Sequence, residues 1–194
     1  MSSVSARLAL SLTLAMVSVQ PGPMAMTVLP VTLPDLTGSA DRVFRGVCLS
    51  AEVGTAEFAG ARIATTTYTF EVGEYLKGGG GKTVTFRQVG TPRGGPADLG
   101  RAAGLPVYTP GLEYVIFLLP ESKARLTSPA GARRGAFLVS GEDVIVPDDI
   151  AGLSPSAAPR GRDTSAGAGG DRVPYRTVRD SILKTLAGAP PARR

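Results

Sequence analysis

Hydrophobic and polar residues alternate along much of this chain, with the period of two that is typical of β-strands. The clearest alternation covers residues 62–72, where apolar and aromatic residues alternate mostly with threonines. Residues 112–119 form a nearly continuous apolar run, which predicts a central strand buried on both faces. Further β-prone segments are residues 42–53, 82–89, 137–140 and 143–146. The last two are close enough to form a hairpin around Gly141.

Helical patterns flank these strands. Residues 33–36 predict one short helical turn with Pro34 early in it, where the missing N–H of proline costs little. Near the C-terminus, apolar residues recur at helical spacing between Pro174 and Gly188, two residues that suit a helix start and a helix end. These apolar positions are Tyr175, Val178, Ile182 and Leu186. We expect this amphipathic helix to pack against the strands.

Glycine- and proline-rich stretches divide the chain. Residues 54–60 and 91–111 are expected as loops, and residues 154–170 as a flexible linker. The predicted organisation is a β domain over residues 26–153, the linker, the helix over residues 171–188 and a disordered tail over residues 189–194. One core is expected, formed by Tyr68, Phe70, Val84, Phe86, Val115 and Phe117.

The N-terminal 25 residues have the pattern of a secretory signal peptide. Arg7 precedes the apolar run of residues 8–19, which is too short to span a bilayer, and a proline-containing break follows. We expect cleavage near Ala25 and export to the periplasm or the extracellular space. A buried apolar helix and an uncleaved N-terminal anchor are the alternatives. No later segment is apolar enough to span a membrane.

The composition argues against most catalytic sites. Histidine is absent and Cys48 is the single cysteine, which leaves no histidine triad, no imidazole metal site and no internal disulfide. We therefore expect no catalytic, cofactor-binding or metal-binding residues and a protein that is not an enzyme. Cys48 is expected as a small core residue rather than as a reactive thiol. The net charge of +5 permits weak attraction to anionic surfaces.

Several motifs suggest chemistry but lack its context. The glycines before Lys82 resemble a phosphate loop, yet a strand is predicted where that motif needs a helix. The neighbouring carboxylates are not placed across a cleft as a glycosidase requires. The Ser122–Lys123 pair is a weak candidate for nucleophilic catalysis, and Arg93-Gly94-Gly95 is a single copy of a motif that matters in arrays. Nucleic acid is not expected as a partner.

Three segments carry a resemblance to a known family. They are Ala40-Asp41-Arg42-Val43-Phe44-Arg45-Gly46-Val47, Tyr68-Thr69-Phe70-Glu71-Val72 with the later Leu76-Lys77-Gly78, and Pro110-Gly111-Leu112-Glu113-Tyr114-Val115-Ile116-Phe117-Leu118. Their order is similar to the netrin-like domain shared with tissue inhibitors of metalloproteinases. It resembles more closely a group of uncharacterised exported bacterial proteins with the same layout. The resemblance covers about residues 40–146 and implies a small OB-like β-barrel. Those inhibitors use an N-terminal cysteine, which is missing here, so their mechanism cannot be carried over.

The loop over residues 91–111 is the expected contact surface, because recognition usually falls to loops while the core is taken up by packing. Arg93, Arg101 and Tyr108 are its candidate contact residues. The alternative is that its apolar end, residues 105–108, folds back as a lid. The expected partner is a protein or an anionic envelope polymer, and the protein is expected to be a monomer. The leading hypothesis is an exported binding or structural module. The alternatives are an inhibitor or regulator of an envelope hydrolase and a hydrolase that uses carboxylates or a Ser/Lys pair.

Overall fold

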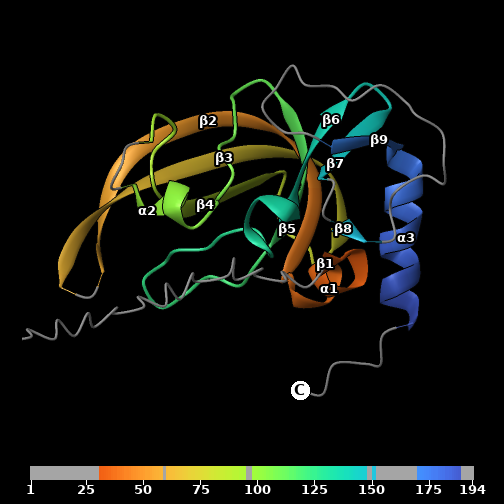
Figure 1. The fold of residues 1–194 in the computed structure, drawn as a ribbon, viewed down its shortest axis with the longest axis horizontal. Coiled ribbons are helices and arrows are strands. Elements are labelled where there is room, and N and C mark those ends of the chain that lie inside the picture. The colour runs from red at the N-terminus through yellow and green to blue at the C-terminus, as the bar shows by residue number, and fades with distance from the viewer. Residues whose placement is uncertain (1–30, 59, 95–97, 148–149, 152–169, 189–194) are drawn as a thin grey trace, which may run out of the picture.

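The computed structural model describes residues 31–58, 60–94, 98–147, 150–151 and 170–188 (Figure 1). The predicted signal peptide, most of the predicted linker and the predicted tail lie outside these residues. Among the described residues, no helix is long and apolar enough to cross a membrane.

One antiparallel sheet of seven strands dominates the structure. In spatial order its strands are β4 (Thr83–Val89), β3 (Ala61–Lys77), β2 (Arg42–Phe58), β5 (Glu113–Leu118), β6 (Ala136–Ser140), β7 (Asp143–Pro147) and β9 (Gly170–Pro174). A second, parallel pair joins β1 (Val31–Thr32) to β8 (Ile150–Ala151). The helical elements are α1 (Leu33–Ser39), α2 (Leu99–Ala102), the 3-10 helix η1 (Ala132–Gly135) and α3 (Tyr175–Gly188).

The mainly β class is confirmed, whereas closure into a barrel is not observed. β4 and β9 form the two edges of the large sheet, and no pairing joins them in the described part of the chain. The OB-like and netrin-like details therefore stay predictions.

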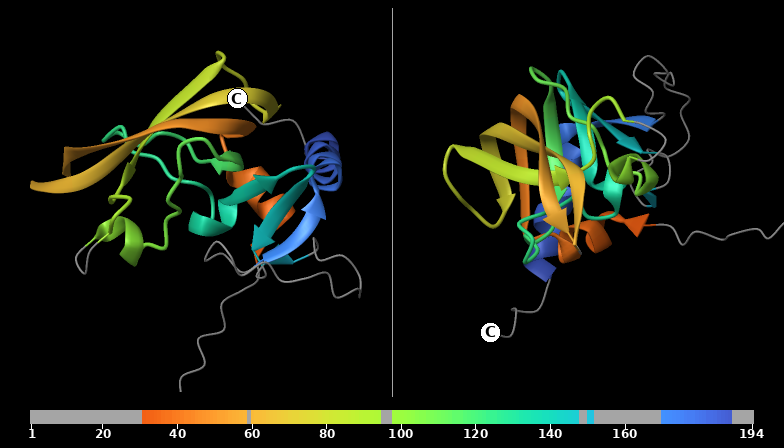
Figure 2. Two further views of the ribbon diagram at one scale, coloured as in Figure 1. Left: turned by 90° about the horizontal axis from the view of Figure 1, so that it is seen from above. Right: turned by 90° about the vertical axis from the view of Figure 1, so that its left-hand side faces the viewer.

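The loop predicted over residues 54–60 is wrong. β2 continues through residues 54–58, and β2 and β3 form a hairpin of two 17-residue strands. The β-branched residues Val53 and Thr55 favour the strand, and cross-strand pairing from Glu52 to Phe58 outweighs the breaking tendency of Gly54. The hairpin projects beyond the rest of the sheet (Figure 2).

β9 was also not predicted, since its residues were assigned to the end of the linker and the start of the helix. Its sequence, GDRVP, has no alternation that marks a strand, and its pairing with β7 supplies the missing stability. Gly170 is required there, because a Cβ atom would lie 2.4 Å from the carbonyl oxygen of Val146. The C-terminal helix is confirmed as α3, and it buries Val178 and Ile182.

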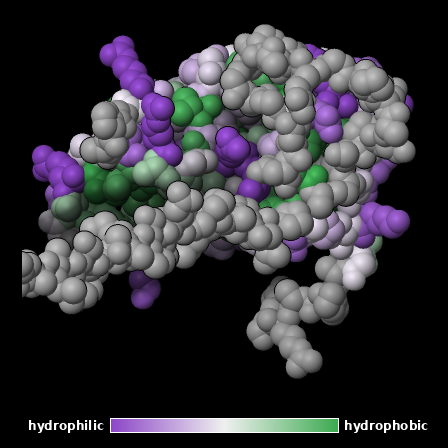
Figure 3. Space-filling view, in the orientation of Figure 1, coloured by the Kyte–Doolittle hydropathy of each residue, from purple (hydrophilic) through white to green (hydrophobic). Residues whose placement is uncertain are grey.

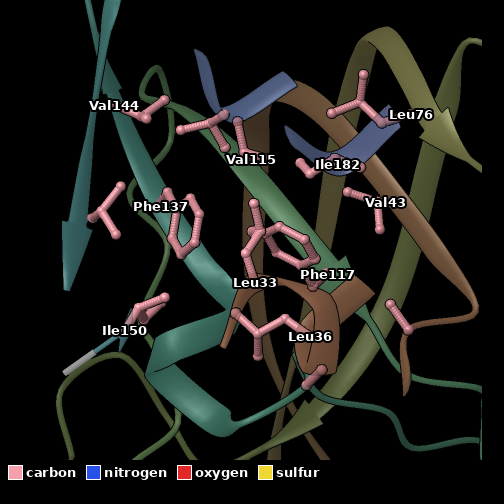
Figure 4. Close-up of a cluster of buried hydrophobic side chains, with 14 of the residues drawn as sticks. Leu33, Leu36, Val43, Leu76, Val115, Phe117, Phe137, Val144, Ile150 and Ile182 are labelled. Atoms are coloured by element: carbon pink, nitrogen blue, oxygen red, sulfur yellow. The ribbon is translucent and has the colours of Figure 1, made fainter. Parts of the chain in front are cut away.

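The residues expected in one core are all buried, but they belong to two hydrophobic clusters. Neighbouring residues of a strand face opposite sides of the sheet, and β5 shows the division clearly. Val115 and Phe117 pack with α1 and α3 in the first cluster (Figure 4). Tyr114, Ile116 and Leu118 pack in the second cluster, which also contains Tyr68, Phe70, Val84, Phe86 and Tyr108. The expectation of a single core is therefore wrong.

Candidate functional site

A groove of about 800 Å³ lies between the segment that follows β4 and the sheet face of β5, β6 and β7. Tyr114, Leu138 and Ile145 form part of its floor, and they are cross-strand neighbours on three adjacent strands. Its other wall is built from residues 89–94, 98, 100–101, 104–107 and 109. On the face seen in Figure 3, hydrophilic and hydrophobic side chains lie next to one another. Grooves of this size are typical of ligand sites.

Three arginines line this groove and give it a positive charge. Arg93 lies between β4 and α2, Arg101 lies in α2, and Arg133 lies in η1. None of the three forms an ion pair with a described residue within 4.0 Å. We call this site the arginine groove. Guanidinium groups without a carboxylate partner are available to bind an anion in a bidentate manner.

Among the described residues that line the arginine groove, Asp98 is the one with an acidic side chain, and its carboxylate already accepts hydrogen bonds from the loop itself. It accepts hydrogen bonds from the backbone N–H of Arg101 at 3.0 Å and of Thr91 at 2.8 Å, and from the Thr91 hydroxyl at 3.1 Å. These bonds, the one from Arg101 first, lower the pKa of Asp98. Asp98 therefore holds the loop in shape and caps α2 instead of neutralising an arginine.

Two glycines allow this loop to fold back on β4. Gly90 has a φ of +94°, which disfavours other residues, and a Cβ on Gly100 would lie 2.5 Å from the Val89 carbonyl oxygen. Because neither glycine has a side chain, the backbone of α2 lies directly against the end of β4. This contact sets the position of α2 and so of the Arg101 backbone.

The structure places two of the three predicted contact residues together. Arg93 and Arg101 both line the arginine groove. Tyr108 was wrongly predicted as a contact residue, because its side chain is only 1% exposed. Its ring packs edge-to-face against Tyr68 at 4.9 Å and Phe70 at 5.2 Å between centroids. The apolar end of the loop thus folds back, which is the alternative that the sequence left open.

Arg133 was missed by the sequence reasoning. It lies in η1, and Gly131, the residue before η1, and Ala132, its first residue, have positive φ angles. The backbone N–H of Arg133 donates to the Gly104 carbonyl at 3.1 Å. That bond ties η1 to the loop that carries Arg101. The sequence signal for a basic site here was a pair of adjacent arginines, 133 and 134, in a turn flanked by glycines. The contact between this turn and residue 104 cannot be inferred from sequence spacing.

Other charged residues serve the fold. Arg45 donates to both carboxylate oxygens of Glu113, at 2.7 and 2.8 Å, and its guanidinium lies 4.4 Å from the centre of the Tyr175 ring. Glu74 accepts a bond from the Tyr175 hydroxyl at 2.7 Å and one from Arg179 at 2.8 Å. We call these five residues the helix network, because they join β2, β3 and β5 to α3.

The remaining sequence candidates have ordinary structural surroundings. Cys48 is fully buried, and burial raises the pKa of its thiol to about 11, so it is a core residue as expected. The glycine-rich turn before Lys82 leads into strand β4, not into a helix. The hydroxyl of Ser122 accepts a bond from the Leu126 backbone. Within the described residues, no group of three or more potential metal ligands is found.

No protein-family model matches this chain, and no match is found among curated proteins.

Proposed function

We propose that this protein is an exported, non-enzymatic binding module whose arginine groove holds an acidic partner. The observation that carries the proposal is the convergence of Arg93, Arg101 and Arg133 on one groove without carboxylate partners among the described residues. Unpaired arginines around one concave site create a positive potential that attracts an anion. The signal-like N-terminus supports export, and the resemblance of residues 40–146 supports an OB-like architecture.

The groove favours an acidic peptide segment over a purely ionic polymer. Its walls include the half-exposed apolar residues Val107 and Leu112, and its floor carries Leu138 and Ile145. A ligand that combines carboxylates with aliphatic side chains would pair with the guanidinium groups and also remove this apolar surface from water. The inhibitor alternative rests on the family resemblance and has no structural observation of its own.

Binding of a fluorescent peptide in which glutamate and leucine alternate tests this function. We expect Arg101→Glu to weaken binding by tenfold or more, which is about 1.4 kcal/mol, and the affinity to fall as salt is added. Arg87→Glu is the matched control, because Arg87 is an exposed arginine on β4 that does not line the groove. Equal losses for both variants would show a general charge effect and would contradict a specific site. A lysine–leucine peptide of equal length should bind weakly.

A further inference from the structure

The outer half of β2 is an open strand edge. Pairing of β2 with β5 ends at Val47, and the bonds between Cys48 and residues 111–112 extend it by one residue. From Ser50 to Phe58 the backbone pairs with β3 on one side, and Leu49 lies at a β-bulge in that pairing. On the other side, no backbone hydrogen bond joins residues 49–58 to any other described residue. The free edge therefore spans ten residues, which is enough for a complete additional strand.

Apart from the β-bulge at Leu49 and two glutamates, this edge lacks the features that usually protect open strands. Natural edge strands carry lysine, proline or a covering segment. The outer half of β2 has no proline, lysine or arginine and exposes Leu49, Val53 and Phe58, with Val53 64% exposed. The opposite edge of the sheet differs, because the N–H of Thr127 donates to the Arg87 carbonyl at 2.9 Å and covers β4 there.

We propose that the outer half of β2 pairs with the same segment of a second copy of this chain, as an antiparallel strand pair around a twofold axis. Such an axis must stand perpendicular to the sheet, so residues of the same face pair with each other. Two registers then use nearly the whole free edge. One places Val53 opposite Val53 of the other copy, and the second places Gly54 opposite Gly54.

Charge favours these two central registers. β2 carries two glutamates in this half, Glu52 and Glu57, and like charges opposite each other destabilise a strand pair. With Val53 at the axis, Glu52 faces Gly54 and Glu57 faces Leu49. With Gly54 at the axis, Glu52 faces Ala56 and Glu57 faces Ala51. In neither register does a glutamate face a glutamate, and in the first the most exposed valine of the edge pairs with its own copy.

Sedimentation equilibrium of the purified protein tests the pairing. We expect the mass of two chains at micromolar to millimolar concentration. Val53→Glu should give one chain, because the change adds a third negative charge to the edge. Its melting temperature should match that of the wild-type protein at concentrations where the wild type is a single chain, because the side chain is exposed. Val53→Thr, which keeps the β-branched shape, should remain a dimer. A single-chain mass of the wild-type protein at all concentrations would overturn the proposal. So would a dimer that survives both Val53→Glu and Gly54→Glu, because in either register one of these changes places two glutamates opposite each other at the axis.

Cysteine cross-linking then tests the register. Val53→Cys or Gly54→Cys should yield a disulfide-linked dimer under mild oxidation, whichever of the two residues lies at the axis. Cys48 does not compete, because it is buried. Thr85→Cys is the control, since Thr85 is exposed on β4 at a distance of two strands from the edge. Equal cross-linking of Thr85→Cys, or none with either β2 variant, would refute pairing through this edge.

Discussion

Removing the hydroxyl of Tyr108 should stabilise the protein. Tyr108 is fully buried, and its hydroxyl has no hydrogen-bond partner among the described residues. Burial raises the pKa of this phenol well above its ordinary range, so the group stays neutral and loses its bonds to water. An unsatisfied buried polar group costs about 1–3 kcal/mol. Tyr108→Phe keeps the ring and removes that cost.

Removing the ring should have the opposite effect. The ring of Tyr108 makes edge-to-face contacts with four others, those of Tyr68, Phe70, Phe86 and Tyr114, at centroid distances of 4.9 to 5.9 Å. Replacing a buried aromatic residue by alanine costs about 3–5 kcal/mol through lost contacts and the cavity left behind. We therefore expect Tyr108→Ala to lose roughly that amount and Tyr108→Phe to gain about 1 kcal/mol.

Denaturant unfolding measures both changes, and Val107→Ala is the control. Val107 is the neighbouring residue of the same loop but is 49% exposed, so its truncation should stay within about 0.5 kcal/mol. A loss above about 1 kcal/mol for Tyr108→Phe would show that the hydroxyl has a partner, and the reasoning about its burial would fail. A loss below about 1 kcal/mol for Tyr108→Ala would show that the loop end is not packed and would return Tyr108 to the list of contact residues.

Three further predictions concern the core and the helix network. Val84→Ala and Val115→Ala should each lower the free energy of unfolding by about 2 kcal/mol. In denaturant unfolding the double variant should lose the sum of the two, because the residues lie in separate clusters. A double-variant loss that differs clearly from this sum would contradict the division into two clusters. Burial alone would raise the pKa of Glu74, but the hydrogen bonds from Tyr175 and Arg179 outweigh burial and lower this pKa overall. The contribution of Glu74 to stability is therefore present at neutral pH and is lost as the pH falls through the lowered pKa. The protection factors of the α3 amides against hydrogen exchange, corrected for the intrinsic pH dependence of exchange, should therefore fall on acidification, and much less so in Glu74→Gln. Cys48 should react with a thiol reagent at pH 8 only after denaturation, since burial holds it as the neutral thiol; fast labelling of the native protein would refute its burial.

The strands with a clear period or a continuous apolar run were predictable from sequence. The alternation over residues 62–72 correctly predicted most of β3, and the apolar run over residues 112–119 predicted β5. The elements that were missed depend on contacts between distant residues. Residues 54–58 of β2 are stabilised by pairing with β3, and β9 is stabilised by pairing with β7, while neither sequence alone has a strong strand pattern.

The candidate site shows the same limit. Arg93 and Arg101 were found because they lie in one long loop, so their proximity follows from the sequence. Arg133 joins them through one bond between η1 and residue 104, which no local pattern encodes. Tyr108 was misassigned for a related reason. An aromatic residue at the end of a loop can be exposed or buried, and the four rings that receive it come from β3, β4 and β5.

Pairing distinguishes the arginines that hold the fold from those available for binding. Arg45 and Arg179 each contact a glutamate at 2.8 Å or less, and each joins α3 to the sheet. Arg93, Arg101 and Arg133 have no such partner among the described residues, and the nearby carboxylate of Asp98 is engaged by backbone N–H groups. Replacing Arg45 by Met should therefore lower stability, because it leaves Glu113 half-buried without its partner. Replacing Arg93 by Met should leave stability unchanged, since it removes a charge that nothing in the fold uses. The two classes of arginine are thus separated by thermal unfolding alone, without knowledge of the ligand. A loss of stability for Arg93→Met as large as that for Arg45→Met would mean that the groove arginines serve the fold, and the argument for a binding groove would lose its basis.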